Sequence, residues 1–456
     1  MNRLVVLDDT AKTAADQLRQ VEPREGGAFY LLYEGKGQSR AASRLLMTKQ
    51  IPPIAGAWES QDSDMLRPSA QWVSAAISHA TEAHSGLLFI HSHPDPSYPI
   101  GLSYSDRSSF LSLADTLAPM LDGPFAAVVV HPNGWAGFLW SGRRIVPVDK
   151  VVAIGRTMRF LSPMQKLNDS NLDSRQHDAL GTVHHRLRRL SVAVVGCGGL
   201  GSPIAEQLVR MGVAELTLID HDVLDSDSNV RRVFGSTAAD LGAPIPPPKV
   251  DIMARHLEKL GLGVHIHPIN GDVRKEEVFR ALLDCDLVFN ATDTHGSRAV
   301  VNELASTYML PVIDVGVRVG SKSNGNLSGL VAETRILTPT TPCLWCRGTI
   351  SADVIRAENL PEHERRQLAE RGYVVQGIGD PAPSVAALTV LGSGLATCAM
   401  LALLSDEGEA APSGYWVDGF LGDSLETQPT LPKDGCRCRQ HIGLGDYAPP
   451  PFMVAE

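Results

Sequence analysis

Val192-Ala-Val-Val195 and the turn that follows it, Gly196-Cys-Gly-Gly-Leu-Gly201, decide the fold of the second half of this chain of 456 residues. The apolar run has the composition of a buried strand, and the residues after the turn, to about Met211, have the pattern of a helix. Glycines let a backbone approach phosphates closely, and a helix N-terminus favours their negative charge. The stretch therefore predicts a nucleotide-binding α/β unit, although a dinucleotide oxidoreductase would show the same turn.

The residues around this stretch alternate between strand and helix patterns. Strands are predicted at 192–195, 215–219, 264–269, 287–290 and 312–315. Such alternation is typical of a doubly wound, mostly parallel, Rossmann-like sheet with helices on both faces. The stretch 243–248 is rich in proline and is expected to be a surface loop, and 352–371 is expected to be a charged, exposed helix.

The first 150 residues or so form a separate, smaller α/β pattern. Strands are predicted at 28–33, 44–49, 87–90, 126–131 and 137–140, and helices at 71–83 and 106–121. Residues 151–174 are expected to be a connecting helix and linker, and 175–456 to be the larger domain. A chain of this length fits two domains better than one core.

Two histidines and an aspartate in the first domain suggest a metal site. His91 and His93 leave the end of a predicted strand on the same side, because alternate strand residues share a face. Asp106 follows at the start of a predicted helix. Two imidazoles and one carboxylate, with water in the fourth position, make a catalytic zinc site.

Hydrolysis at such a site also needs a carboxylate that relays a proton from the zinc-bound water, whose pKa falls to about 7. Glu25, just before the first predicted strand, is our candidate, and Glu59 and Glu34 are weaker alternatives. Ser103 is expected to hydrogen-bond the developing oxyanion.

The complete pattern, His-x-His followed by Ser-x-x-Asp, with a glutamate before an upstream strand, resembles the JAB/JAMM (Mov34/MPN) metalloprotease family over roughly residues 20–145. His265 and His267 also form a His-x-His pair, but no Ser-x-x-Asp follows them, so we interpret them as part of a strand without a metal site. The resemblance implies cleavage of peptide or isopeptide bonds after the C-terminal glycines of ubiquitin-like proteins.

More charged residues follow the glycine-rich turn than a hydride-transfer site would need. In-line attack on an α-phosphate needs cations for the phosphate oxygens and a carboxylate for magnesium. The candidate residues are Asp220, Asp222, Asn229, Arg231, Arg232, Lys249 and Asp293, together with Gly196, Gly198, Gly199 and Gly201.

This set resembles the ThiF/MoeB and ubiquitin-activating, E1-like adenylating superfamily, from about residue 175 to the C-terminus. The resemblance implies that Asp222 binds the ribose, that Asn229, Arg232 and Lys249 bind the triphosphate, and that Asp293 binds Mg²⁺. It also implies that Arg175 reaches the ATP of a partner subunit, so that a homodimer is expected.

Four of the seven cysteines fall in two close pairs, Cys343 with Cys346 and Cys436 with Cys438. Their spacing predicts a closed, structural zinc site of four thiolates. The other three, Cys197, Cys285 and Cys398, are poorly placed for a covalent intermediate, and the loop 375–384, just before the apolar stretch 385–404, contains no cysteine. The acyl-adenylate would then be the last product, pass to a partner's nucleophile, or react with a hydroxyl such as that of Ser384.

The composition limits the partners. A net charge of −10 argues against a nucleic-acid or anionic-membrane surface, since both demand concentrated Lys and Arg. For the charge-free stretch 385–404 we favour a buried core or interface helix over a membrane span, because glycine, serine and threonine interrupt it. The acidic N-terminus and paired thiols suit the cytoplasm.

The sequence thus predicts a fused enzyme that uses ATP, Mg²⁺ and two zinc ions, one catalytic and one structural. It would trim or release a ubiquitin-like protein and adenylate its C-terminal glycine, as in bacterial ubiquitin-like pathways, with a conjugating enzyme as a further partner. Three alternatives stay open: activation of a sulfur-carrier protein for cofactor or metabolite biosynthesis, a non-catalytic regulatory scaffold, and a nicotinamide oxidoreductase.

Overall fold

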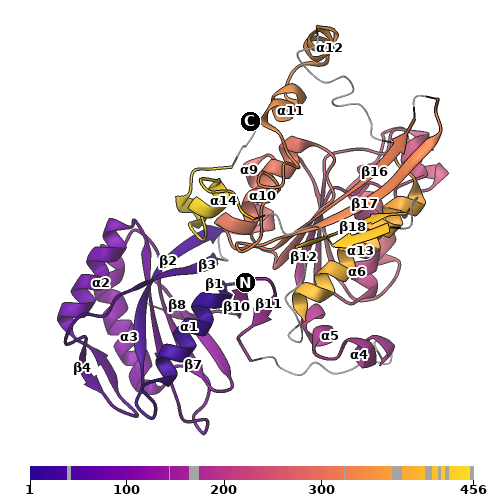
Figure 1. Ribbon diagram of the computed structural model, residues 1–456. Coiled ribbons are helices and arrows are strands. Elements are labelled where there is room, and N and C mark those ends of the chain that lie inside the picture. The colour runs from indigo at the N-terminus through magenta and orange to yellow at the C-terminus, as the bar shows by residue number, and fades with distance from the viewer. Residues whose placement is uncertain are drawn as a thin grey trace. The chain divides into compact units, whose positions relative to one another are not determined.

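The computed structural model describes residues 1–38, 43–142, 144–163, 174–322, 324–371, 383–405, 413–419, 423–426 and 431–451. The chain forms two compact units (Figure 1). The first contains Met1–Lys166, Thr307–Met309 and His441–Pro449, and the second contains Leu167–Ser306, Leu310–Gln440 and Pro450–Glu456. Residues 164–173 of the predicted linker, and residues 372–382 before the apolar stretch, lie outside the described residues.

The first unit is built on one large mixed sheet in the order β11-β10-β1-β3-β2-β6-β7-β8-β9, with a separate hairpin β4-β5. Its strands are β1 (Arg3–Leu7), β2 (Gly27–Lys36), β3 (Ser43–Ile51), β4 (Trp58–Gln61), β5 (Leu66–Pro68), β6 (Gly86–Ser92), β7 (Phe125–His131), β8 (Gly134–Ser141), β9 (Arg144–Pro147), β10 (Lys150–Ile154) and β11 (Met158–Phe160). Its helices are α1 (Asp8–Arg19), α2 (Ala70–Glu82) and α3 (Tyr104–Leu117).

Side chains that alternate along the strands give this sheet two apolar faces, and helices pack on both. Tyr30 belongs to a core cluster that includes Ala14 and Leu18 of α1. Its neighbour Phe29 points the other way and meets Trp72 of α2, with ring centroids 5.0 Å apart. Strand β6, which contains His91 and directly precedes His93, contacts both α1 and α2 and is therefore covered on both faces.

Part of the predicted linker is instead a sheet element. Residues 150–160 form β10, which pairs parallel to β1, and β11, which pairs antiparallel to β10. The expected helix at this place was therefore wrong. The run Val151-Val-Ala-Ile154 is short and rich in β-branched residues, which favours a buried strand.

The second unit contains a sheet in the order β14-β13-β12-β15-β16-β17-β18-β19. The strands are β12 (Ser191–Val195), β13 (Glu215–Asp220), β14 (His265–Asn270), β15 (Leu287–Asn290), β16 (Val312–Ser321), β17 (Leu327–Leu337), β18 (Gly414–Asp418) and β19 (Asp423–Glu426). The helices are α4 (Ser174–Leu180), α5 (Thr182–Leu187), α6 (Gly201–Arg210), α7 (Asp227–Val230), α8 (Lys249–Glu258), α9 (Glu276–Leu282), α10 (His295–Thr307), α11 (Ala352–Glu358), α12 (Glu362–Glu370), α13 (Ala386–Leu404) and α14 (Arg437–Gln440).

Five neighbouring strands of this sheet, β14, β13, β12, β15 and β16, are parallel. Strand order reverses between β12 and β15, which creates a crevice at the carboxyl ends of these strands, where open α/β sheets bind ligands. In Figure 1, α9 and α10 lie on the opposite side of the sheet from α6 and α13. The predicted fold class, α/β with a Rossmann-like, mostly parallel sheet, is confirmed.

The charge-free stretch forms α13, which is long and apolar enough to cross a membrane. Within its most apolar window, 56% of the residues are buried in the protein. The helix packs against β16, β17 and α6. This burial favours the core-helix interpretation.

Candidate active sites

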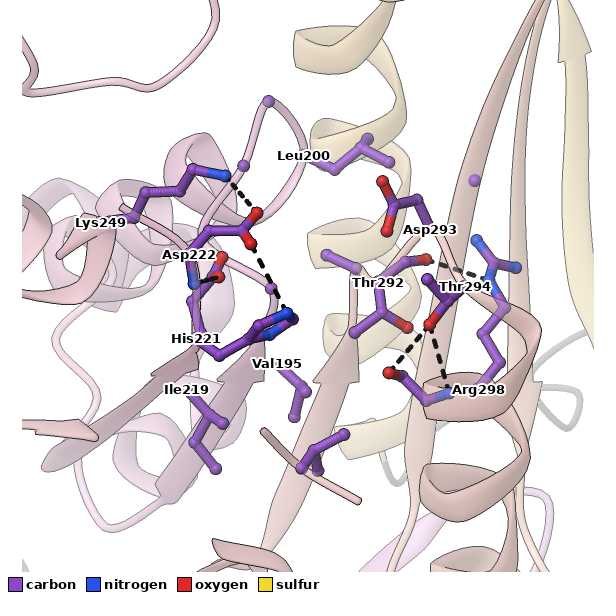
Figure 2. Close-up of a pocket in the computed structure, with 18 of the residues that line it drawn as sticks. Val195, Leu200, Ile219, His221, Asp222, Lys249, Thr292, Asp293, Thr294 and Arg298 are labelled. Carbon is purple, nitrogen blue, oxygen red and sulfur yellow. Dashed lines mark hydrogen bonds and ion pairs between the residues drawn. The ribbon is translucent and has the colours of Figure 1, made fainter. Parts of the chain in front are cut away.

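A pocket lies at the strand reversal of the second unit, and eight of the twelve predicted nucleotide-binding residues line it. The phosphate turn enters from the end of β12, Asp220 and Asp222 from the end of β13, and Asp293 from the end of β15. Figure 2 shows Asp222, His221 and Lys249 on one side of the pocket and Asp293, Thr292 and Arg298 on the other.

The turn has the backbone geometry that its glycines permit. Gly196 has a φ of +92°, in the region that favours glycine. At Gly201, a Cβ would lie only 1.7 Å from the carbonyl oxygen of Gly196. The thiol of Cys197, in the same turn, is buried, and burial raises its pKa well above the usual value. This thiol is therefore no nucleophile at neutral pH.

Two aspartates at the end of β13 have different tasks. Asp220 accepts hydrogen bonds from the backbone N–H groups of Cys197, at 2.6 Å, and Asp222, at 2.8 Å, so that it holds the turn together. The carboxylate of Asp222 lies 2.6 Å from Nζ of Lys249, which is itself buried. Burial alone would raise the pKa of Asp222, but its hydrogen bond with Lys249 and the charge of that lysine outweigh burial and lower it.

A cation also faces the turn. Arg232 lines the pocket, and its Nη2 donates to Oδ1 of Asn229 at 2.9 Å. Its buried Nε has no hydrogen-bond partner among the described residues. Since an unpaired buried guanidinium nitrogen is costly, this donor fits an anionic ligand such as a phosphate.

The other four predicted residues of this set, Gly201, Asn229, Arg231 and Arg175, are not among the lining residues. Asn229 is buried and orients Arg232. Arg231 is exposed and is not among the lining residues. Arg175 is exposed on α4, also outside the lining.

The structure adds pocket residues that the sequence did not single out for this role, among them His221, Asp272, Thr292 and Arg298. We interpreted Arg298 from sequence as a packing and salt-bridge residue. It does bind buried Asp314, at 3.2 Å, but it also donates to the carbonyl of Thr292 at 3.0 Å and so fixes the residue before Asp293. Its place one turn into the helix after Asp293 was the available signal.

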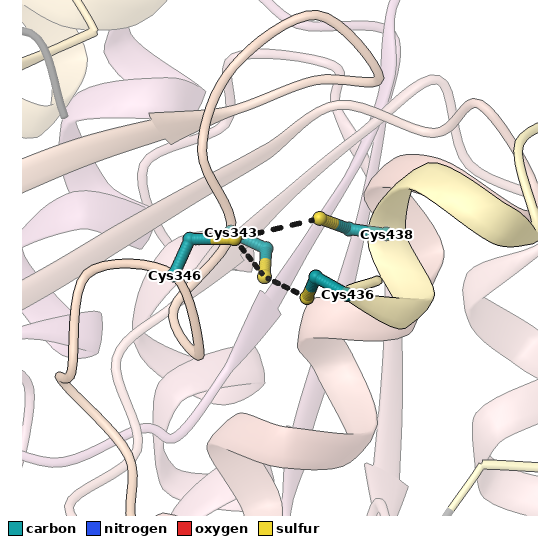
Figure 3. A group of neighbouring side chains, drawn as sticks. All are labelled: Cys343, Cys346, Cys436 and Cys438. Carbon is teal, nitrogen blue, oxygen red and sulfur yellow. Dashed lines mark hydrogen bonds between the residues drawn. The ribbon is translucent and has the colours of Figure 1, made fainter. Parts of the chain in front are cut away.

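The four paired cysteines converge in the second unit (Figure 3). Sulfur–sulfur distances are 3.6 Å for Cys343 to Cys346 and to Cys436, and 3.7 Å for Cys346 to Cys438. Tetrahedral zinc with Zn–S bonds of about 2.3 Å places its sulfurs roughly 3.8 Å apart. Hydrogen bonds from its neighbours, that of Cys438 first, lower the pKa of Cys343 to about 5. The donor set therefore fits a closed zinc site.

In the first unit, the two histidines and the aspartate also meet. Nε2 of His93 lies 3.2 Å from Nε2 of His91 and 3.1 Å from Oδ2 of Asp106. Ligands about 2.0–2.1 Å from a tetrahedral zinc lie roughly 3.3 Å apart, so these spacings fit a single ion. The bonds from both histidines overcome the effect of burial and lower the pKa of Asp106.

Glu25 and Ser103 border this group. The Glu25 carboxylate is buried and lies 3.8 Å from Nε2 of His93. Burial raises its pKa to about 7, with His93 opposing the rise and Asp106 adding to it. Ser103 caps α3: its Oγ accepts from the backbone N–H of Asp106 at 3.1 Å, and Asp106 accepts from the backbone N–H of Ser103 at 2.8 Å. The alternatives fit less well, since Glu34 pairs with Lys36 and Glu59 with Arg67.

A family model described as the ThiF family matches residues 174–438. The chain belongs to the ThiF family. This membership covers the unit that contains the glycine-rich turn, the pocket and the four cysteines.

Curated relatives share part of this region. The SAMP-activating enzyme E1 of Haloferax volcanii is 29% identical over 161 residues, which cover 35% of this chain and 54% of that protein. The sulfur carrier protein ThiS adenylyltransferase of Bacillus subtilis is 29% identical over 161 residues, 35% of this chain and 44% of that protein. Ubiquitin-like modifier-activating enzyme 5 of Aedes aegypti is 28% identical over 302 residues, 62% of this chain and 68% of that protein. The first two matches thus span about half of each relative.

Among solved structures, the chain is similar to MccB of E. coli with ATP. The TM-score is 0.44 at 17% identity, over 59% of this chain and 74% of that chain.

Proposed function

We propose that the second unit adenylates the C-terminal carboxylate of a ubiquitin-like or sulfur-carrier protein, with Mg-ATP as co-substrate. A carboxylate oxygen attacks the α-phosphorus, the bond from that phosphorus to the bridging oxygen breaks, and pyrophosphate leaves. The products are the acyl-adenylate and pyrophosphate. The names of the relatives, which activate SAMP, ThiS or a ubiquitin-like modifier, support this substrate class.

The observation that carries the proposal is the distribution of charge around the glycine-rich turn. Asp222 would hold the ribose hydroxyls, and Lys249 and Arg232 would offset the charge of the phosphates. Asp293, exposed on the opposite side of the pocket, would hold Mg²⁺, which when bound neutralises charge on the leaving pyrophosphate. So many charged groups do not suit hydride transfer, which argues against the oxidoreductase alternative.

ATP–pyrophosphate exchange tests this function directly. Purified protein is assayed with and without candidate carrier proteins that end in glycine. We expect exchange only with the right carrier, and a loss of at least about 100-fold in Asp293→Ala. Absence of exchange with every carrier, although ATP binds, would support the non-catalytic scaffold instead.

The same assay separates the two carrier classes when it is extended by a sulfur source. A sulfur-carrier protein would yield a thiocarboxylate at its C-terminus, detected by mass spectrometry of the carrier. A ubiquitin-like protein would instead pass to a conjugating enzyme or another nucleophile, and its mass would not change by sulfur.

We further propose that the first unit is a zinc-dependent protease for the same carrier. His91, His93 and Asp106 would hold the ion, which when bound polarises a water and the scissile carbonyl. Glu25 is buried beside His93 with a raised pKa, which suits a group that takes and returns a proton near neutral pH. Ser103 would donate its hydroxyl hydrogen to the oxyanion.

A carrier with a short peptide after its C-terminal glycine tests the protease. We expect cleavage behind the glycine, at least about 100-fold slower in Glu25→Gln because the proton relay is lost. Since Glu25→Gln keeps all three proposed ligands, zinc content should stay unchanged. Cleavage at the wild-type rate by this variant would exclude Glu25 as the acid–base residue.

A further inference from the structure

Helix α10 begins directly after the magnesium side of the nucleotide pocket. Its first residue, His295, is two positions beyond Asp293, and Arg298 of its first turn donates to the carbonyl of Thr292 at 3.0 Å. Arg298 also binds Asp314 on β16. Any rotation or shift of α10 would therefore move the Thr292–Asp293 backbone.

The start of α10 is fixed by a carboxylate from another helix. Glu358, at the end of α11, accepts hydrogen bonds from the backbone N–H groups of His295, at 2.8 Å, and Gly296, at 2.9 Å. These bonds satisfy two donors that the helix itself cannot satisfy. The position of the rest of the helix then depends on contacts farther along.

Two consecutive residues of α10 contact the two cysteine pairs. Oδ1 of Asn302 accepts from the backbone N–H of Leu344, at 2.8 Å, inside the Cys343–Cys346 turn. Oε2 of Glu303 lies 3.4 Å from Nε of Arg437, the residue between Cys436 and Cys438. Asn302 and Glu303 are 1% and 3% exposed, so both acceptors are buried, while the Arg437 side chain is 31% exposed.

The geometry links these contacts to the pocket. Arg298 and Asn302 are four residues apart, so they lie on one face of α10, one turn from each other. Each cysteine pair provides one contact, and a zinc ion held by all four sulfurs would fix the distance between the two contacts. A metal-bound cluster would thus present a rigid surface against which α10 is oriented.

We propose that Asn302 and Glu303 are positioning residues, which couple the four-cysteine cluster to the Asp293 side of the nucleotide pocket through α10. The inference rests on the proposed adenylation, because it assigns Asp293 to Mg²⁺. Neither residue lines the pocket. Their effect on the reaction would therefore act only through Thr292, Asp293 and Arg298.

Calorimetric binding of two nucleotides to the full chain tests this coupling. Mg-ATP reports on both sides of the pocket, whereas AMP without magnesium reports mainly on the Asp222 side. In Asn302→Ala and in Glu303→Ala we expect about tenfold weaker Mg-ATP binding, within the usual range of coupling between sites, and AMP binding within about twofold of wild type. Zinc content, measured by elemental mass spectrometry, should stay at the wild-type level.

Matched variants separate coupling from general loss of packing. Glu303→Gln keeps an oxygen acceptor for Arg437 and should bind Mg-ATP as wild type does. Val301→Ala removes buried methyl groups from the same helix without a hydrogen bond to either site, and should lower the melting temperature but not the Mg-ATP affinity.

Three outcomes overturn the inference. Mg-ATP binding could equal wild type in both alanine variants, AMP and Mg-ATP binding could fall by the same factor, or Val301→Ala could reproduce the loss. Glu303→Ala decides the question if Asn302→Ala does not fold. Failure of wild-type protein to bind Mg-ATP at all would instead refute the proposed function.

Discussion

At the scale of single residues, glycine occupies the phosphate turn for two different reasons. Gly201 allows two segments of backbone to approach each other, since a Cβ there would lie 1.7 Å from the Gly196 carbonyl oxygen. Gly198 faces open space in the pocket, and a Cβ there would meet no protein atom within 4 Å. The first glycine serves the fold and the second leaves room for a ligand.

Substitution by alanine should therefore separate stability from binding. Gly201→Ala should lower the unfolding free energy of the second unit by about 3 kcal/mol or more, because backbone has to shift. Gly198→Ala should leave the melting temperature within a degree or two and weaken ATP binding by about tenfold, because its methyl group takes space beside the phosphates. Thermal unfolding and ATP titration of both variants check this.

A stability loss in Gly198→Ala, or a change in Gly201→Ala that affects ATP binding alone, would contradict our assignment of the turn. If Gly198→Ala bound ATP as tightly as wild type does, the phosphates would not lie against this glycine.

Spacing along the chain predicted which residues meet, but not how each one is held. Two histidines at alternate positions were expected on one side of a strand, and their Nε2 atoms lie 3.2 Å apart. The helix was predicted to begin at Asp106, but α3 begins at Tyr104. Ser103 and Asp106 therefore form a capping box, which the sequence prediction did not include. Likewise, the contact of Arg298 with Asp314 needs β16 beside β15, which local sequence does not encode.

At the scale of elements, α1 is tied to the edge of the first sheet by an ion pair. Asp8, the first residue of α1, accepts from Nε of Arg159 on β11 at 2.7 Å and also pairs with Lys12. Burial would raise the pKa of Asp8, but the hydrogen bonds from Lys12 and Arg159 outweigh burial and lower it. The folded state therefore favours the ionised carboxylate.

This lowered pKa predicts a pH-dependent contribution to stability. A group whose folded pKa lies below its unfolded value stabilises the fold above the unfolded pKa, and the contribution is lost as the pH falls through the folded pKa. Asp8→Asn should thus reduce the unfolding free energy by about 1 kcal/mol or less at pH 7, since the pair is partly exposed. The difference from wild type should shrink below about pH 4.

Urea denaturation of both proteins at pH 7 and at decreasing pH measures the two free energies. A difference that stays constant down to the acid transition would mean that Asp8 is not ionised preferentially in the folded state.

Sequence patterns identified the central strands of both sheets. They missed a strand whose partner is distant in the sequence, and a break between two helices that a single proline marks. Strand β10 pairs with β1, about 150 residues earlier, so a linker was predicted there. The charged helix expected at 352–371 is two helices, α11 and α12, with Pro361 as the residue before the second. Proline lacks a backbone N–H and disfavours a helical residue before it, so Pro361 was a sequence signal for this break.

At the scale of the whole molecule, the two sets of metal ligands should act independently, because they belong to different compact units. We expect two zinc ions per chain by native mass spectrometry. His93→Ala should remove one ion and the protease activity while ATP–pyrophosphate exchange remains. Cys343→Ser should remove the other ion and lower the stability of the second unit, because a structural zinc site contributes directly to folding.

One zinc ion per chain, retained in His93→Ala and lost in Cys343→Ser, would leave the cysteine cluster as a metal site and refute the catalytic one. One zinc ion per chain, lost in His93→Ala and retained in Cys343→Ser, would instead leave the histidine group as the metal site and refute the cysteine site.

The expected homodimer is the property of the whole molecule that depends most on one residue. Arg175 is exposed on α4 and does not line the pocket of its own chain. If it reaches the partner's ATP, Arg175→Ala and Asp293→Ala should each be inactive alone. In a mixed dimer, however, the Arg175→Ala chain keeps its own Asp293 and receives Arg175 from its partner, so that one of the two sites is complete.

Random reassociation of equal amounts of the two variants gives about half mixed dimers and hence about one quarter of wild-type exchange activity. Activity near one quarter after co-refolding or co-expression would establish a site shared across the dimer, whereas an inactive mixture, or an active Arg175→Ala homodimer, would show that each chain completes its own site.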